Sequence, residues 1–99
     1  MYLVVFRSRK RADIDRAAYD AQAQAMETLA RQQPGYLSFK SYLADDGETV
    51  AISEWRDKGA AKAWGRVAEH NVAQADGRAR WYGEYTIFAC ENPSIHRFP

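Results

Sequence analysis

The order of strand-like and helix-like segments is the feature that most limits the folds open to this chain. Two helical stretches are expected, at about 13–32 and 58–76, and each is flanked by short runs rich in aromatic and β-branched residues. These runs predict four strands, at about 2–7, 36–44, 48–56 and 83–90. The resulting order, β-α-β-β-α-β, is that of a ferredoxin-like split βαβ fold. This is an α+β class in which both helices lie on one face of a four-stranded antiparallel sheet.

Local signals predict where the segments begin and end. Asp13 is the predicted N-cap of the first helix, and Asp15 would lie in its first turn, near the positive end of the helix dipole. A proline followed by Gly35 ends that helix. The Asp-Asp-Gly turn at 45–47 predicts a β-hairpin, and Asp57 is the predicted cap of the second helix.

Each predicted helix has one apolar face. Alanine dominates the face of the first helix, which allows close approach to a sheet, and its members are Ile14, Ala18, Ala21, Ala25, Met26 and Leu29. The face of the second helix comprises Ala60, Trp64, Val67, Ala68, Asn71 and Ala75. Asn71 is the only polar member of that second face.

The predicted strands are apolar on both of their alternating faces. The first strand has Tyr2, Val4 and Phe6 on one side and Leu3 and Val5 on the other. A sheet with one face in water alternates between apolar and polar residues, and no further segment is left to cover a second apolar face. We therefore expect a homodimer that packs through the open sheet face about a two-fold axis.

Residues 1–91 are expected to form one domain, and the aperiodic tail at 92–99 is expected to lie against a neighbour. The net charge of +1 provides no field for nucleic acid or an anionic membrane. No stretch approaches the roughly 18 apolar residues of a membrane span, and no signal-peptide pattern opens the chain, so a cytoplasmic location is expected. The basic cluster at 7–11 is expected in a solvated loop, with a phosphate or carboxylate contact as the alternative.

Cys90 is the single cysteine, so no intrachain disulfide can form, and it is expected to be a small buried hydrophobic residue. The cysteine spacing gives no indication of a metal site. Glu54 is expected to face inward and to need a partner such as an arginine, while His96 in the tail is expected at the surface.

The stretch 53–90 contains all three tryptophans and indicates either a ligand pocket or a thick core. Asn71 on the face of Trp64 either hydrogen-bonds neighbouring backbone or meets a ligand in a cavity, because an unsatisfied buried amide costs roughly 1–3 kcal/mol. His70 is the best candidate base by its chemistry, although it lies about 240° around the helix from Trp64. It faces either a pocket groove or solvent.

Several aromatic residues are candidates for the lining of such a pocket, with sheet core or dimer contact as the alternative: Phe39, Trp55, Trp81, Tyr82 and Tyr85. Arg78 and Arg80 either hold an anionic substrate group or are solvated.

With these residues placed, residues 1–91 resemble the antibiotic biosynthesis monooxygenase (ABM) family of dimeric α+β barrels. The resemblance is carried by Pro34-Gly35-Tyr36, Ser53-Glu54-Trp55, Ala63-Trp64, Glu69-His70, Gly77-Arg78-Ala79-Arg80-Trp81-Tyr82 and Tyr85. It implies a ligand site between the helices and the sheet of one subunit. It also implies a cofactor-independent monooxygenase or quinol oxidase that acts on aromatic phenols or quinols with dioxygen.

On that resemblance, Trp64, His70 and Asn71 are the candidate catalytic residues, with no metal and no cofactor. Haem degradation, which the family also contains, is disfavoured because the first strand has no Asn and Gln74 stands where the haem-binding His would be expected. The alternatives are a non-catalytic dimeric binder of a small hydrophobic metabolite and a cofactor-free isomerase or cyclase.

Overall fold

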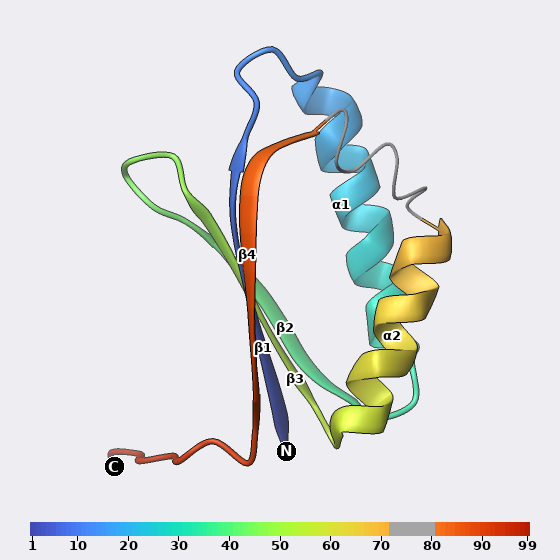
Figure 1. The fold of residues 1–99 in the computed structure, drawn as a ribbon, viewed down its shortest axis with the longest axis vertical. Helices are drawn as coiled ribbons and strands as arrows, with labels where there is room; N and C mark the ends of the chain where they lie inside the picture. Colours follow the sequence, from blue (N-terminus) through green and yellow to red (C-terminus); the bar gives the residue numbers. More distant parts are fainter. Residues whose placement is uncertain (72–80) are drawn as a thin grey trace.

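The computed structural model describes residues 1–71 and 81–99, without the side chains of residues 69–71. Its elements are β1 (Tyr2–Lys10), α1 (Arg16–Arg31), β2 (Tyr36–Leu43), β3 (Thr49–Trp55), α2 (Lys58–Asn71) and β4 (Tyr82–Glu91). The four strands form one antiparallel sheet in the order β2-β3-β1-β4. Both helices lie on the same face of this sheet (Figure 1). The predicted ferredoxin-like α+β fold is confirmed.

Strand β1 is longer than predicted and contains most of the basic cluster that was expected in a loop. Ser8 pairs with Thr49 of β3 on one side and with Tyr85 of β4 on the other, and β1 continues to Lys10. Hydrogen bonding to two neighbours extends the strand because it satisfies the backbone on both sides. The prediction that this strand ends near Arg7 was therefore wrong.

The helix caps differ in how well the sequence predicts them. Asp15, not Asp13, is the N-cap of α1, and its Oδ1 accepts a hydrogen bond from the backbone N–H of Ala18 at 3.0 Å. Asp13 instead pairs with a guanidinium nitrogen of Arg11 at 3.2 Å. The predicted cap of α2 is confirmed, since Asp57 Oδ1 accepts from a first-turn N–H at 2.8 Å.

The buried face of α1 is rotated slightly from the predicted one. Ala18, Met26 and Leu29 are partly buried as expected, whereas Ala21 and Ala25 are exposed. The side of α1 that faces the sheet also includes Tyr19, Gln22 and Ala30, of which Ala30 is fully buried.

The packed core is small and lies near the starts of β1 and α2. Trp55 is fully buried there among Ala30, Ala60 and Ala61. Gly35 sits against this cluster with φ of +82°, and a Cβ at that position would lie 2.6 Å from the Cβ of Ala60. The glycine is therefore needed both for its backbone conformation and for the close approach of α2.

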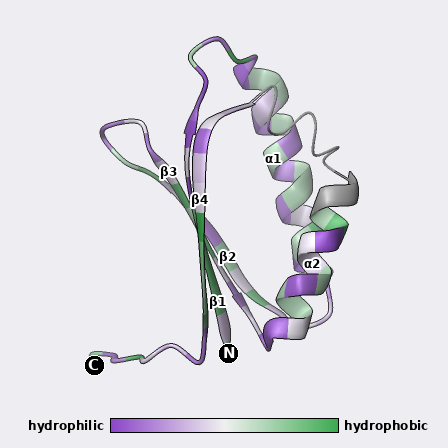
Figure 2. Ribbon diagram, viewed as in Figure 1, coloured by the Kyte–Doolittle hydropathy of each residue, from purple (hydrophilic) through white to green (hydrophobic). Residues whose placement is uncertain are grey.

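The opposite face of the sheet carries no helix (Figure 1). The middle of β4 and much of β1 consist of hydrophobic residues (Figure 2). Phe88 of β4 is 52% exposed and Tyr42 of β2 is 48% exposed. Cys90 is also exposed, contrary to the predicted burial, because β4 is an edge strand in a single chain. Glu54 accepts a hydrogen bond from Ser38 Oγ at 2.5 Å, so its partner is a serine rather than an arginine.

The tail beyond β4 runs away from the helix layer (Figure 1), and its Phe98 is 94% exposed. Neither helix, over its described residues, has the length and apolar character needed to cross a membrane.

Candidate functional site

A cavity of about 690 Å³ lies between the two helices and the sheet. Small-molecule sites in proteins commonly measure roughly 300–1,000 Å³. Small residues make up most of the wall that α2 contributes, namely Ala61, Gly65 and Ala68 beside Trp64, and Ala23 adds another from α1, which leaves space above the sheet. Of the two hypotheses for the aromatic stretch, this volume favours a pocket over a filled core.

Two tryptophans close one end of the cavity. The Trp55 and Trp64 rings stack with centroids 5.9 Å apart and an interplanar angle of 20°. The Trp55 indole N–H donates to Ser53 Oγ at 3.0 Å, which satisfies the only polar atom of this buried side chain. Trp64 therefore both supports the core and presents its ring to the cavity, a surface suited to a planar ligand.

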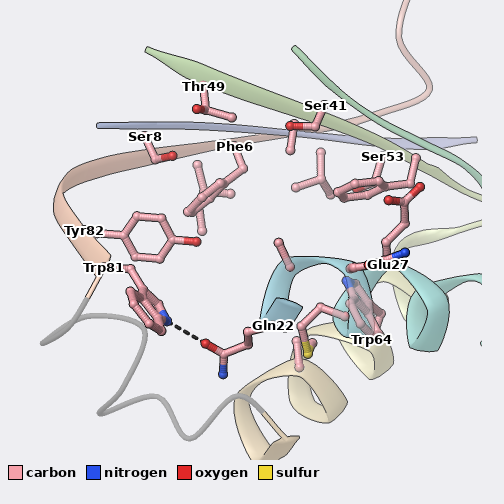
Figure 3. Close-up of a pocket in the computed structure, with 18 of the residues that line it drawn as sticks. Phe6, Ser8, Gln22, Glu27, Ser41, Thr49, Ser53, Trp64, Trp81 and Tyr82 are labelled. Atoms are coloured by element: carbon pink, nitrogen blue, oxygen red, sulfur yellow. Dashed lines mark hydrogen bonds between the residues drawn. The ribbon is translucent and has the colours of Figure 1, made fainter. Parts of the chain in front are cut away.

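Hydroxyl groups lie along the sheet floor of the cavity. They come from β1, β2 and β3 and are those of Ser8, Ser41, Thr49 and Ser53 (Figure 3). Ser8 is only 2% exposed. A hydroxyl both donates and accepts hydrogen bonds, so this floor can contact a ligand that carries several oxygen atoms.

A lysine and two tyrosines form the other end of the cavity. Lys10 Nζ donates to Ser8 Oγ at 2.8 Å and lies 4.8 Å and 5.2 Å from the ring centroids of Tyr19 and Tyr82. Burial, and then the nearby positive charge of Arg16, lowers the pKa of Lys10 from 10.5 to about 8. Burial is also the largest cause of the raised pKa values of Tyr19 and Tyr82, whose hydroxyls hydrogen-bond to each other.

Trp81 joins the start of β4 to α1 at this same end. Its indole N–H donates to Gln22 Oε1 at 2.5 Å, as the dashed line in Figure 3 shows. Its ring packs edge-on against Tyr19 with centroids 5.8 Å apart, and only 4% of Trp81 is exposed. These two contacts hold the residue before β4 against α1.

The structure brings five of the eight predicted site residues together around the cavity: Phe39, Trp55, Trp64, Trp81 and Tyr82. Tyr85 is not among the lining residues described, and it packs beside two of them, Phe6 at 5.4 Å and Tyr82 at 5.7 Å between centroids.

His70 and Asn71 are the last two residues of α2, and their side chains lie outside the described residues. Arg78, Arg80 and Gln74 also lie outside them. Among the side chains of residues 1–68 and 81–99, no three of His, Cys, Asp or Glu are grouped so that they could hold a metal ion.

Sequence reasoning missed the polar end of the cavity, namely Ser8, Lys10, Tyr19 and Gln22. The signal for the first two was present, because Val4, Phe6, Ser8 and Lys10 continue one period-two face of β1. Because the predicted strand ended near Arg7 and the following charged residues were expected in a loop, the prediction left out Ser8 and Lys10.

A two-helix layer over one face of a β2-β3-β1-β4 sheet, with a cavity between the layers, defines this protein as a ferredoxin-like α+β protein with an internal pocket. Residues 1–76 match the family described as antibiotic biosynthesis monooxygenase, ABM. The chain belongs to that family.

The chain is also similar to a known sequence and to solved structures. The chain is 35% identical over 86 residues to the uncharacterized protein YqjZ of Bacillus subtilis, a match that covers 87% of this chain and 74% of YqjZ. The structure is similar to that of Rv0793 from Mycobacterium tuberculosis, with a TM-score of 0.80, 22% identity and coverage of 97% and 98% of the two chains. It is also similar to a crystal structure of an antibiotic biosynthesis monooxygenase, with a TM-score of 0.74, 17% identity and coverage of 95% and 100%. At these identities the two structural matches show the fold alone.

Proposed function

We propose that this protein is a small oxygenase or quinol oxidase that binds an aromatic phenol or quinol in the cavity and reacts it with dioxygen without a bound cofactor. The observation that carries the proposal is the cavity of about 690 Å³ with stacked Trp55 and Trp64 at one end and hydroxyl groups on its floor. Membership of the ABM family supports the reaction class.

The chemistry requires a substrate that can itself supply the electrons. A hydroquinone that loses its phenolic protons gives two electrons to dioxygen, and the products are a quinone and hydrogen peroxide. An anthrone loses a proton from its CH₂ group, and the carbanion adds dioxygen to form a peroxide. Breakage of the O–O bond, with loss of the second C–H proton, leaves one oxygen atom as the new carbonyl and releases the other as water. Both reactions need a base near the acidic position and donors for the developing anion.

His70 is the proposed base and Asn71 the proposed hydrogen-bonding partner of the substrate. Both belong to the last turn of α2, which begins just beyond the cavity-lining residue Ala68. Asn71 follows Trp64 by two helical turns, which supports grouping the two positions. The chemistry of imidazole, with a reference pKa near ~6.5, suits proton transfer at neutral pH.

Oxygen uptake by the purified protein, measured with hydroquinones and anthrones, tests the function. We expect uptake by the wild type that is lost in a His70→Ala, Asn71→Ala double variant. His96→Ala is the matched control, because His96 is exposed in the tail and its loss should leave uptake unchanged. Uptake by the wild type no faster than by the double variant would refute the proposal.

The same experiment separates the alternatives. Binding of these compounds with no chemical change indicates a non-catalytic binder of hydrophobic metabolites. Conversion at the same rate with and without oxygen indicates an isomerase or cyclase.

We further propose that the protein is a homodimer that packs through the helix-free sheet face. The exposed side chains of Phe88 and Tyr42 support this, because burying an aromatic side chain is worth roughly 1.5–3 kcal/mol. The tail beyond β4, which contains the exposed Phe98, also runs on the side of the sheet away from the helices (Figure 1).

Sedimentation at micromolar concentration should give a dimer for the wild type and a monomer for Phe88→Lys. Ala21→Lys, which adds the same charge on the exposed side of α1, should stay dimeric. A monomeric wild type is the result that contradicts a dimer.

A further inference from the structure

The charge of Lys10 has no counter-ion among the residues that the structure describes. No Asp or Glu of residues 1–68 and 81–99 lies within ion-pair distance of its ammonium group, although six ion pairs form among those residues. Its ammonium group contacts the neutral Ser8 hydroxyl and the faces of Tyr19 and Tyr82. A half-buried cation that lacks a carboxylate partner among these residues is electrostatically suited to bind an anion.

We propose that the end of the cavity formed by Ser8, Lys10, Tyr19 and Tyr82 binds an anionic oxygen, carboxylate or phenolate, of a planar aromatic ligand whose ring lies farther along the cavity. This inference rests on the proposed function in taking the cavity as the ligand site. It adds the charge of the ligand and the orientation in which it binds.

The donors at this end fit such an oxygen. Ser8 Oγ accepts a hydrogen bond from the Lys10 ammonium group, so the serine O–H stays available as a donor, and the ammonium group has two further N–H donors. Both groups line the cavity. Hydrogen bonds from a cation to an oxyanion are about twice as strong as neutral ones, and burial strengthens them further.

The surroundings of Lys10 favour a negative ligand. Arg16 of α1 is a second cation, with its guanidinium carbon 5.7 Å from the Tyr19 centroid, and its charge contributes to the low pKa of Lys10. On β4, Tyr82 stays neutral because burial raises its pKa. Asp20 of α1 also lines the cavity, and its charge raises the pKa of Tyr19. An anion placed beside Lys10 would offset both the desolvation of the ammonium group and its repulsion by Arg16.

Two probes of matched shape test the proposal without any turnover. The anion 2-naphthoate and the neutral 2-naphthamide differ in charge but share the same ring system. Their binding can be followed by quenching of tryptophan fluorescence, because Trp55, Trp64 and Trp81 all line the cavity. At pH 7 we expect the wild type to bind 2-naphthoate at least about 10-fold more tightly than 2-naphthamide.

Three variants identify the source of that preference. Lys10→Met should bind both probes equally, and its retained binding of 2-naphthamide shows that the cavity is intact. Lys10→Arg should keep the preference, since the charge remains. Lys40→Met is the matched control, because Lys40 lies 5.4 Å from the Tyr42 ring centroid but is exposed and does not line the cavity.

The preference of the wild type should also fall between pH 8 and pH 10, as Lys10 loses its proton, while the charge of 2-naphthoate stays constant. The probe 2-naphthol distinguishes the two sources of the anion. A naphtholate absorption band on binding at neutral pH assigns the subsite to phenols, and preference for 2-naphthoate without that band assigns it to carboxylates.

Equal affinities in the wild type, a preference that survives in Lys10→Met, or failure of both naphthoate and naphthamide to bind would each overturn the subsite. If oxygen uptake persists while the preference is absent, only the subsite is wrong. If the preference is present without oxygen uptake, only the proposed oxidation is wrong.

Discussion

Replacement of Gly65 by alanine is expected to stabilise the protein, because this glycine lies in the interior of α2 and has no structural need to be glycine. Gly65 is the eighth of the 14 residues of the helix, and a Cβ built there meets no atom within 4 Å. Glycine in a helix interior costs about 0.8–1 kcal/mol relative to alanine. Since no clash offsets the gain, Gly65→Ala should raise the free energy of unfolding by about 0.8–1 kcal/mol.

The hairpin glycine Gly47 provides a control in which space is equal and only the backbone differs. A Cβ at Gly47 also meets nothing within 4 Å, but its φ is +90°, a conformation that L side chains rarely adopt. Gly47→Ala should therefore lower the free energy of unfolding by about 1 kcal/mol. Gly35→Ala, with both a positive φ and a 2.6 Å contact to Ala60 Cβ, should be the most destabilising of the three.

Thermal unfolding followed by circular dichroism, at one fixed protein concentration, measures all three variants. A change of 1 kcal/mol corresponds to a shift of about 4–8 °C in Tm for a domain of this size. The reasoning fails if Gly65→Ala does not raise Tm, or if Gly47→Ala matches it. Gly65→Phe extends the test to function: its ring would occupy the cavity, and binding of 2-naphthamide should be lost while the protein stays folded.

Three further predictions concern buried polar groups and helix caps. Ser53→Ala removes the acceptor of the fully buried Trp55 N–H and should cost roughly 1–3 kcal/mol in urea unfolding; an unchanged midpoint would show that another acceptor replaces the hydroxyl. The stability of the wild type should rise from pH 8 to pH 10, and this rise should be absent in Lys10→Met. The sign follows because the folded protein, with the pKa of Lys10 lowered to about 8, has released a proton that the unfolded chain keeps up to about 10.5. Urea unfolding at each pH checks it, and parallel profiles would contradict it. Asp15→Ala should lower the free energy of unfolding by about 1 kcal/mol because it removes the cap of α1. Asp13→Ala should change it by less than about 0.5 kcal/mol, and equal effects of the two variants would contradict Asp15 as the cap.

The sequence predicts the layers of this fold better than its local details. The order of elements, the hairpin and the Asp57 cap follow from turn and cap residues that act over four or five positions. The choice between Asp13 and Asp15 does not, because either aspartate can cap a helix and the exit of the chain from β1 decides which one does. The bulge in β2 between Tyr36 and Ser38 likewise changes which side chains share a face, and it arises from pairing with β3 rather than from any residue of β2 alone.

The extension of β1 shows why the polar end of the site was missed. Charged residues disfavour a strand only when they lack partners, and here alternate side chains are accommodated in two different ways. Arg7 and Arg9 form ion pairs at 3.0 Å with Glu48 and at 2.8 Å with Asp46. Lys10, on the other face, reaches the cavity. Those carboxylates are about 40 residues away in the sequence, so only the tertiary structure shows that the basic cluster is part of a strand.

The distinction between pocket and core can be argued from side-chain size and polarity on the facing layers. A filled core needs large apolar residues along the helices, but apart from Trp64 the cavity is lined from α2 by Ala61, Gly65 and Ala68. It also needs apolar residues on the sheet, and the inward positions here include the hydroxyls of Ser41 and Thr49. Because a hydroxyl buried in a dry core without a partner is costly, small helix residues opposite inward serines and threonines indicate space that water or an oxygen-bearing ligand fills. The tryptophans alone could not decide this, since Trp55 and Trp64 serve the core and the cavity at once.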